Sequence, residues 1–129
     1  MFLKQANGNT GYSAVFEDDG KVAYAYLLSE NRIVADVWLY NRIVTPQEPE
    51  WRDRSKGPFA NPQGFAASDP FPPVLDEAEI TFEWSRGADG QTELRVFIRG
   101  EYHAVLVSGS KPGWRKLAVK DGPLALVMK

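Results

Sequence analysis

The sequence contains no cysteine and only one histidine. The absence of cysteine excludes disulfide bonds and thiolate chemistry, and together with the lone histidine it leaves carboxylates as the main metal ligands. No stretch approaches the roughly 20 apolar residues that a membrane-spanning helix requires. The first residues also lack the basic segment and apolar run of a secretory signal. We therefore expect no membrane partner and a cytoplasmic location.

The chain also lacks a strong charge of either sign, with 15 basic and 17 acidic residues and a net charge of −2. Nucleic-acid binding normally needs a marked basic surface, so we expect no nucleic-acid partner. The acidic stretch Glu17–Gly20 lacks the alternating ligand spacing of a calcium loop. No serine or aspartate stands in a recognisable nucleophile motif. We expect neither a metal nor a cofactor.

Helical periodicity is missing too, whereas strand-like alternation recurs along the chain. At 129 residues the chain has room for one domain, and we expect a single β domain over residues 1–129. Sequential hairpins predict an all-β antiparallel meander of about eight strands, closed into a sandwich or barrel. The expected strands cover residues 12–16, 22–28, 33–40, 79–85, 93–99, 103–107, 114–120 and 124–128.

Turn dipeptides set the expected registers. Asp19-Gly20 fits a two-residue type I′ turn, which would place Asp18 opposite Lys21 as a cross-strand ion pair. Gly100-Glu101 fits a type II′ turn, which would place His103 opposite Ile98 on the apolar face. Asp121-Gly122 would join the last two strands as a hairpin.

The single histidine has two interpretations. His103 could act as a general base tuned by partial burial, or it could be an imidazole at the edge of the core that hydrogen-bonds a neighbour. The expected register places His103 on the apolar face, which favours the second interpretation. Asp36, Glu83 and Glu101 offer no sequence reason to form a pair of catalytic carboxylates. The sequence therefore favours a protein without catalytic activity.

Aromatic residues alternate along two neighbouring expected strands, as Tyr24, Tyr26, Trp38 and Tyr40, with Asp36 among them. The length of the connection at 29–32 decides whether they share a face. An exposed ladder of this kind would suit a protein partner, but in a small sandwich such large residues are more often core.

Residues 45–77 break the strand pattern and hold seven of the nine prolines. Long connections of this kind are uncommon in compact domains and are usually functional or disordered. Trp51, Phe59, Phe65 and Phe71 predict that the segment packs back on the sheet. Within it, Glu50-Trp51-Arg52-Asp53-Arg54 has the residue mix of an interaction surface, and the alternative is a cover over an open sheet edge.

Three groups of residues resemble a bacterial family. They are Phe16–Gly20 with Tyr24-Ala25-Tyr26, then Asp36–Asn41, and finally Phe82–Ser85 with Tyr102–Val105. Together they resemble the small proteins grouped as domain of unknown function 2251, over about residues 11–44 and 78–107. The long proline-rich segment and the C-terminal third depart from that pattern. The family brings no established activity, although small proteins of this kind often accompany toxins as immunity proteins.

These observations favour a non-catalytic protein-binding domain, with an immunity-type inhibitor as one form of it. The mildly acidic 45–77 segment would suit a basic target. One alternative is a small-ligand binder or enzyme with a pocket under 45–77, which would use His103 or Asp36 as its polar group. Another is a structural dimerisation domain. The candidate binding residues are Trp51, Arg52, Arg54, Asp36, Trp38, Tyr40 and His103.

Overall fold

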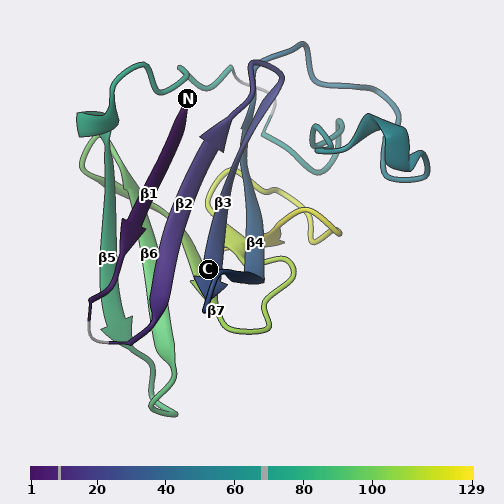
Figure 1. The fold of residues 1–129 in the computed structure, drawn as a ribbon. Coiled ribbons are helices and arrows are strands. Elements are labelled where there is room, and N and C mark those ends of the chain that lie inside the picture. The colour runs from purple at the N-terminus through teal and green to yellow at the C-terminus, as the bar shows by residue number, and fades with distance from the viewer. Residues whose placement is uncertain (9, 68–69) are drawn as a thin grey trace.

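The computed structural model describes residues 1–8, 10–67 and 70–129. Two β-sheets face each other, one with strand order β1-β2-β3-β4 and one with order β5-β6-β7-β8-β9 (Figure 1). The predicted all-β fold is confirmed, and the two layers form a sandwich. The strands are β1 (Phe2–Ala6), β2 (Tyr12–Asp18), β3 (Val22–Ser29), β4 (Arg32–Asn41), β5 (Ile80–Arg86), β6 (Thr92–Ile98), β7 (Glu101–Val107), β8 (Trp114–Arg115) and β9 (Leu126–Val127).

The core lies between the sheets, where alternate residues of the strands point inward. Ala14 and Phe16 of β2 meet Ala25 and Leu27 of β3, and all four are fully buried. Among the described residues the only helices are the short 3₁₀ turns η1 (Arg54–Lys56) and η2 (Glu77–Glu79). Neither is long and apolar enough to cross a membrane.

β1 has no counterpart among the expected strands. Its sequence, Phe-Leu-Lys-Gln-Ala, does not alternate, and four of its five residues are exposed. It is a strand because it pairs antiparallel with β2, from Phe2 opposite Glu17 to Ala6 opposite Ser13. A strand stabilised by backbone pairing at a sheet edge leaves little trace in side-chain periodicity.

The predicted ion pair between Asp18 and Lys21 is wrong. The β2–β3 register places Asp18 opposite Ala23, and the turn residues are Gly20 and Lys21. The side chain of Asp19 fixes this turn because its Oδ1 accepts from the N–H groups of Lys21 and Val22. The register differs from the expected one by two residues, so every side chain keeps its predicted face.

The β6–β7 turn also differs from expectation. Arg99 and Gly100 are its central residues, with φ of 50° and 81°, as a type I′ turn requires. Ile98 therefore lies opposite Glu101, and the predicted pairing of Ile98 with His103 is wrong. A register shift beside Val96 then turns His103 inward, so that it reaches the apolar face by a bulge.

The expected C-terminal hairpin does not form. β8 and β9 have two residues each and pair in parallel, with Trp114 opposite Leu126. The intervening chain instead bonds to other segments: Val119 N–H donates to Phe65 O, and Leu124 O accepts from Trp38 N–H. These bonds to distant parts of the chain replace the local turn that Asp121-Gly122 predicted.

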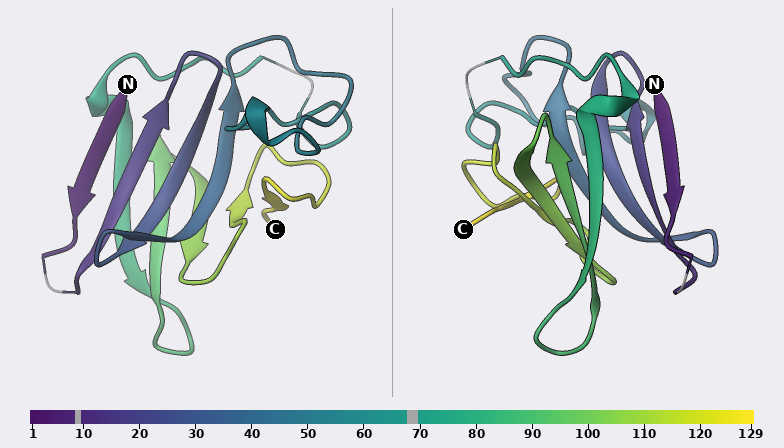
Figure 2. Two further views of the ribbon diagram at one scale, coloured as in Figure 1. Left: turned by 45° about the vertical axis from the view of Figure 1, so that its right-hand side comes forward. Right: turned by 90° about the vertical axis from the view of Figure 1, so that its left-hand side faces the viewer.

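One side of the sandwich is closed and the other is open. Along β4, Gly109 N–H donates to Val34 O, and Gly113 N–H donates to Asp36 O. These bonds tie the edge of the first sheet to the chain that follows β7. On the opposite side β1 and β5 are the outer strands of their sheets, and Figure 2 shows both of them along that side.

Candidate functional site

Residues 45–77 fold back on the first sheet, as predicted. Lys21 Nζ holds the segment by donating to the carbonyls of Lys56 at 2.8 Å and Pro58 at 3.2 Å, and it lies 2.9 Å from Glu50 Oε1. On the same face the Tyr24 hydroxyl donates to Phe59 O at 2.7 Å. Lys21, in the turn before β3, and Tyr24, in β3, therefore fix the middle of the segment.

Asn41, at the end of β4, joins the sheet to the same segment. Its Oδ1 accepts from Trp38 Nε1 and from Asn61 N–H, both at 2.9 Å. Its Nδ2 donates to Asn61 O at 2.8 Å and to Thr45 Oγ1 at 3.4 Å. Sequence reasoning missed this residue, because an asparagine at a strand end looks like an ordinary turn former.

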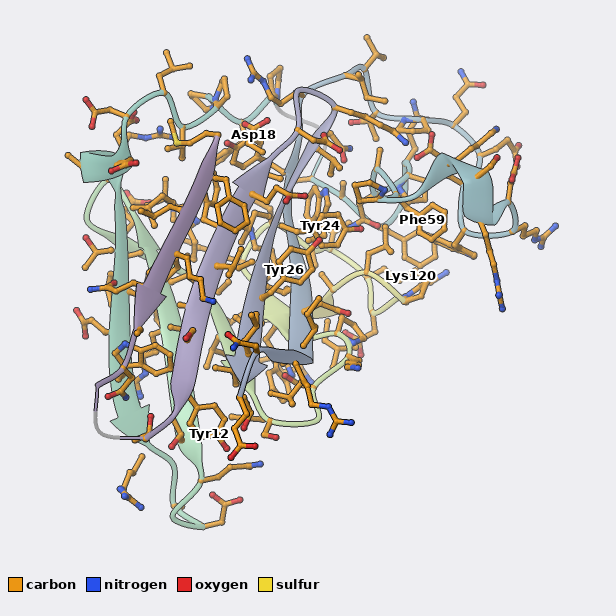
Figure 3. The ribbon with its side chains drawn as sticks, viewed as in Figure 1. Tyr12, Asp18, Tyr24, Tyr26, Phe59 and Lys120 are labelled. Atoms are coloured by element: carbon orange, nitrogen blue, oxygen red, sulfur yellow. The ribbon has the colours of Figure 1, made fainter. Side chains whose placement is uncertain are left out.

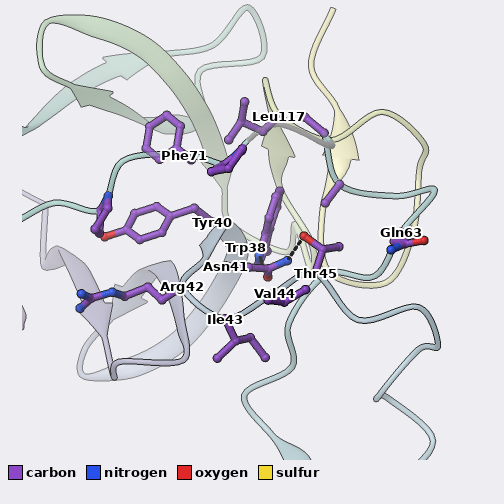
Figure 4. Close-up of a pocket in the computed structure, with 14 residues that line it drawn as sticks. Trp38, Tyr40, Asn41, Arg42, Ile43, Val44, Thr45, Gln63, Phe71 and Leu117 are labelled. Atoms are coloured by element: carbon purple, nitrogen blue, oxygen red, sulfur yellow. Dashed lines mark hydrogen bonds between the residues drawn. The ribbon is translucent and has the colours of Figure 1, made fainter.

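A pocket of about 550 Å³ lies between the end of β4 and this segment (Figure 4). Arg42 is the one charged side chain among its described lining residues, which include no carboxylate. The volume lies within the range of ligand pockets, roughly 300–1,000 Å³. The lining consists of Trp38, Tyr40, Asn41, Arg42, Ile43, Val44, Thr45, Gln63, Ala66, Ala67, Pro70, Phe71, Pro73 and Leu117.

The rim of the pocket exposes apolar side chains. Val44 is 91% exposed and Ile43 is 42% exposed, directly after β4. Large exposed aliphatic residues beside a hollow are typical of a binding surface, and here the hollow has both apolar and polar lining residues. This arrangement can bind an apolar group and hydrogen-bond a polar neighbour through Thr45 or Gln63.

The aromatic ladder is split between the two faces of the first sheet. Tyr24 lies opposite Trp38 and Tyr26 opposite Asp36, so these four share the outer face. A register shift beside Tyr24 turns Tyr40 to the inner face. Figure 3 shows Tyr24 and Tyr26 next to each other, with ring centroids 6.0 Å apart, and Phe59 beyond them.

Most of this ladder is core, as expected. Tyr24 is 7% and Trp38 is 2% exposed, so neither offers a self-association surface. Burial raises the pKa of Tyr24, and it raises that of Tyr26 to about 12. Burial also raises the pKa of the Asp36 carboxyl, and the positive charge of Lys111 partly offsets that rise.

Tyr40 and His103, both inward-facing, meet through Phe71. The Phe71 ring centroid lies 5.3 Å from that of Tyr40 and 5.4 Å from that of His103. The guanidinium of Arg115 lies over the same ring, 5.2 Å from its centre. The long segment thus contributes one aromatic side chain to the end of the sandwich core.

His103 is engaged at both ring nitrogens. Arg115 Nη1 donates to its Nδ1 at 2.9 Å, so the ring proton resides on Nε2, which lies 3.4 Å from Glu101. Burial lowers its pKa to about 4, with further lowering by Arg115 and Lys116. A neutral imidazole whose basic nitrogen, Nδ1, already accepts from Arg115 fits the core-edge interpretation and leaves no free basic nitrogen for general-base catalysis.

Arg115 is fully buried without a carboxylate among the described residues as its partner. Its Nε donates to Leu39 O at 2.8 Å and its Nη1 to His103 O at 3.1 Å, while Nη2 has no hydrogen-bond partner within the described residues. Burial lowers its pKa to about 9, so it stays protonated at neutral pH. Backbone carbonyls and the Phe71 ring face take the place of a counter-ion.

The remaining candidates lie on the outer lobe of the segment. Trp51 is half-buried, with its ring edge toward Phe65 at 5.4 Å between centroids, and so anchors the segment internally. Arg52 and Arg54 are exposed and form no ion pair within the described part of the chain. The structure therefore brings Trp38 and Tyr40 to the pocket and leaves Arg52 and Arg54 outside it. Asp36 and His103 are not among the described residues that line it.

No protein-family model, curated protein or solved structure matches this chain. The resemblance to domain of unknown function 2251 therefore stays a prediction. Across residues 1–8, 10–67 and 70–129, no three His, Asp or Glu side chains group closely enough to hold a metal ion.

Proposed function

We propose that this chain is a non-catalytic binding protein that takes an apolar segment of a protein partner into the pocket beneath residues 45–77. The observation that carries the proposal is the pairing of a pocket of mixed apolar and polar lining with exposed aliphatic side chains, Ile43 and Val44, at its rim. Interface anchors characteristically fill such pockets while the surrounding rim excludes water.

The charges around the pocket favour an acidic partner segment. Arg42 is the charged group of the described lining, and Arg52 and Arg54 on the neighbouring lobe form no ion pair with any residue that the structure describes. Three acidic residues of the segment are engaged locally: Glu50 with Lys21, Asp53 as the cap of η1 and Asp76 as the cap of η2. A carboxylate beside the apolar anchor would therefore meet Arg52 and Arg54, and it would share Arg42 with Asp18, whose Oδ1 lies 3.5 Å from Arg42 Nη1. This differs from the basic target that the net charge of 45–77 suggested.

Peptide selection tests the proposal. A displayed library of random 12-residue peptides would be panned against the wild type and counter-panned against Val44→Asp. We expect enriched sequences with an aromatic or aliphatic anchor beside an acidic residue. The chemical-shift changes that these peptides cause in the NMR spectrum of the protein should map to residues 41–45, 63–67 and Leu117. Leu75→Asp is the matched control, because Leu75 is 74% exposed in the same segment but does not line the pocket. Equal binding by Val44→Asp would contradict the proposal.

An immunity-type inhibitor is one form of this function, suggested by the family resemblance. Its test is rescue of growth when the chain is co-expressed with a toxic protein encoded beside it. Loss of rescue in Val44→Asp, but not in Leu75→Asp, would support the pocket as the inhibitory surface. Rescue by both variants would remove the pocket from this form of the proposal.

A small apolar ligand is a second candidate occupant, favoured by the pocket volume of about 550 Å³. A thermal-shift screen of small carboxylic acids with aromatic or aliphatic tails tests it, because Arg42 lies in the lining. Stabilisation by such compounds, lost in Val44→Asp and Arg42→Gln, is the expected result. A flat response across the screen would remove this candidate.

A further inference from the structure

The outer edge of β1 is an unpaired strand edge in the described structure, at the opposite end of the first sheet from β4 and the pocket. Met1 O accepts from Asp18 N–H, and Asn7 N–H donates to Tyr12 O, with no register shift between them. In antiparallel pairs the hydrogen-bonded residues alternate, so odd-numbered residues bond to β2. Phe2, Lys4 and Ala6 therefore direct their N–H and C=O groups to the open edge. No backbone partner for these groups is found in the described parts of the chain.

The side chains beside this edge offer an apolar surface. Phe2 is 59% exposed and Ile33 is 50% exposed on the outer face of the same sheet. A hollow of about 290 Å³ lies between them, lined also by Val15, Tyr26 and Leu28, with Glu17 as its charged residue. Residues that an added strand places opposite Phe2 would cover part of this surface.

We propose that the β1 edge accepts an extended antiparallel strand of a partner protein, with an acidic side chain opposite Lys4 and apolar side chains opposite Phe2 and Ala6. Strand addition of this kind takes affinity from main-chain hydrogen bonds and specificity from alternate side chains. Lys4 stands in the middle of the edge, with its ammonium 3.1 Å from Asn31 Oδ1 and no carboxylate partner among the described residues.

Lys4 also argues against a second copy of this chain as the occupant. The self-pairing register that uses Phe2, Lys4 and Ala6 of both copies places Lys4 directly opposite Lys4 of the other copy. Like charges in directly opposite positions are unfavourable, and an edge lysine is a common device against edge-to-edge association. A carboxylate in that position converts the same lysine into a favourable contact.

Synthetic peptides test the proposal directly. The probe is acetyl-Thr-Val-Thr-Glu-Thr-Val-Thr-amide, in which the central Glu and both Val residues share one face. Its controls are the same peptide with Lys in place of Glu and a version N-methylated at the central residue. We expect saturable binding of the Glu peptide with protection of the Phe2, Lys4 and Ala6 amides from hydrogen exchange. The Lys peptide should bind about five- to tenfold more weakly, and N-methylation should abolish binding.

A charge-reversed variant completes the test. Lys4→Glu should reverse the order of the two peptides, and Val44→Asp should leave both affinities unchanged, which separates this surface from the pocket. Because Lys4 is exposed, we expect Lys4→Glu to fold normally. A thermal midpoint of unfolding close to that of the wild type would confirm this. Three results would overturn the proposal: no binding of any peptide, protection confined to the other open edge at Ile80, Phe82 and Trp84, or a peptide-free dimer that protects the β1 amides.

Discussion

The hydroxyl of Tyr40 donates to Asp18 Oδ2 at 2.8 Å and accepts from the N–H of Val74 at 3.0 Å. Asp18 belongs to β2, Tyr40 to β4 and Val74 to the long segment, so one buried phenol joins three parts of the chain. Asp18 is 4% exposed and also lies 3.5 Å from Arg42 Nη1. A buried carboxylate of this kind depends on its hydrogen bonds.

Tyr40→Phe should therefore destabilise the fold by about 2 kcal/mol, because it leaves the Asp18 oxygen and the Val74 N–H short of a partner in a buried place. Urea unfolding at neutral pH measures the change. Tyr26→Phe is the matched control, since no hydrogen bond of the Tyr26 hydroxyl is found in the described structure, and it should stay within about 0.5 kcal/mol of wild type. Equal losses in both variants would contradict the role given to Tyr40.

His103 should make stability depend on pH. Its folded-state pKa is about 4, below the usual value of 6.5, so the unfolded chain binds more protons between these values. Stability should fall as pH drops from about 6.5 to about 4, by at most about 3 kcal/mol from this group.

The variant His103→Gln isolates that contribution, because a glutamine oxygen can still accept from Arg115 but cannot titrate. Urea unfolding at several pH values should show a smaller loss in the variant than in the wild type over this range. The carboxyls with a lowered pKa, Glu50, Asp53 and Glu79, contribute equally to both proteins. Parallel pH profiles would contradict the assignment to His103.

The sequence predicts the parts of the fold that side-chain alternation specifies. The strands expected over residues 12–16, 22–28 and 33–40 correspond to β2, β3 and β4, each of which extends one or two residues further. In β2 and β3 the faces are predicted correctly although the register is not, because a two-residue shift preserves the direction of each side chain. In β7 the register shift beside Val96 places Val105 opposite Arg95, so its predicted place on the apolar face is wrong. The sequence does not predict β1 or the parallel pairing of β8 with β9. Backbone hydrogen bonds to distant segments hold these strands, and such bonds leave no local pattern in the sequence.

The candidate site is harder to predict because it depends on bulges and on a long connection. One bulge sends Tyr40 to the inner face, and another turns His103 inward. The pocket lies beside Asn41, which fastens the 45–77 segment to the end of β4, and Lys21 fastens the same segment outside the pocket. The prolines and aromatics of that segment indicate that it packs, but not which carbonyls it presents to those two residues.

Lys21 should control whether the segment stays attached. Lys21→Met removes its bonds to Lys56 O and Pro58 O and its ion pair with Glu50. Since these groups lie at the surface, we expect a loss of about 1 kcal/mol in global stability. The larger effect should be local, as faster hydrogen exchange over residues 50–61 with β2 and β3 still protected.

Lys56→Met is the control for that experiment, because the Lys56 side chain is exposed and its contribution to the anchor is its backbone carbonyl. Its exchange rates should match the wild type. Unchanged exchange over 50–61 in Lys21→Met would show that Tyr24 and Asn41 hold the segment without Lys21.

Gly113 should tolerate no side chain at the point where the two sheets are joined. Its N–H donates to Asp36 O at 2.7 Å and its carbonyl accepts from Leu126 N–H at 2.9 Å. A Cβ atom here would lie 2.5 Å from Val105 O and 3.3 Å from Leu106 Cγ. Gly113→Ala must shift a strand backbone, and we expect the free energy of unfolding measured in urea to fall by about 2 kcal/mol or more.

Gly8→Ala is the control, because a Cβ there meets nothing within 4 Å, and its stability should match the wild type. Equal stability of Gly113→Ala and the wild type would show that the junction between β4 and the chain after β7 is loose.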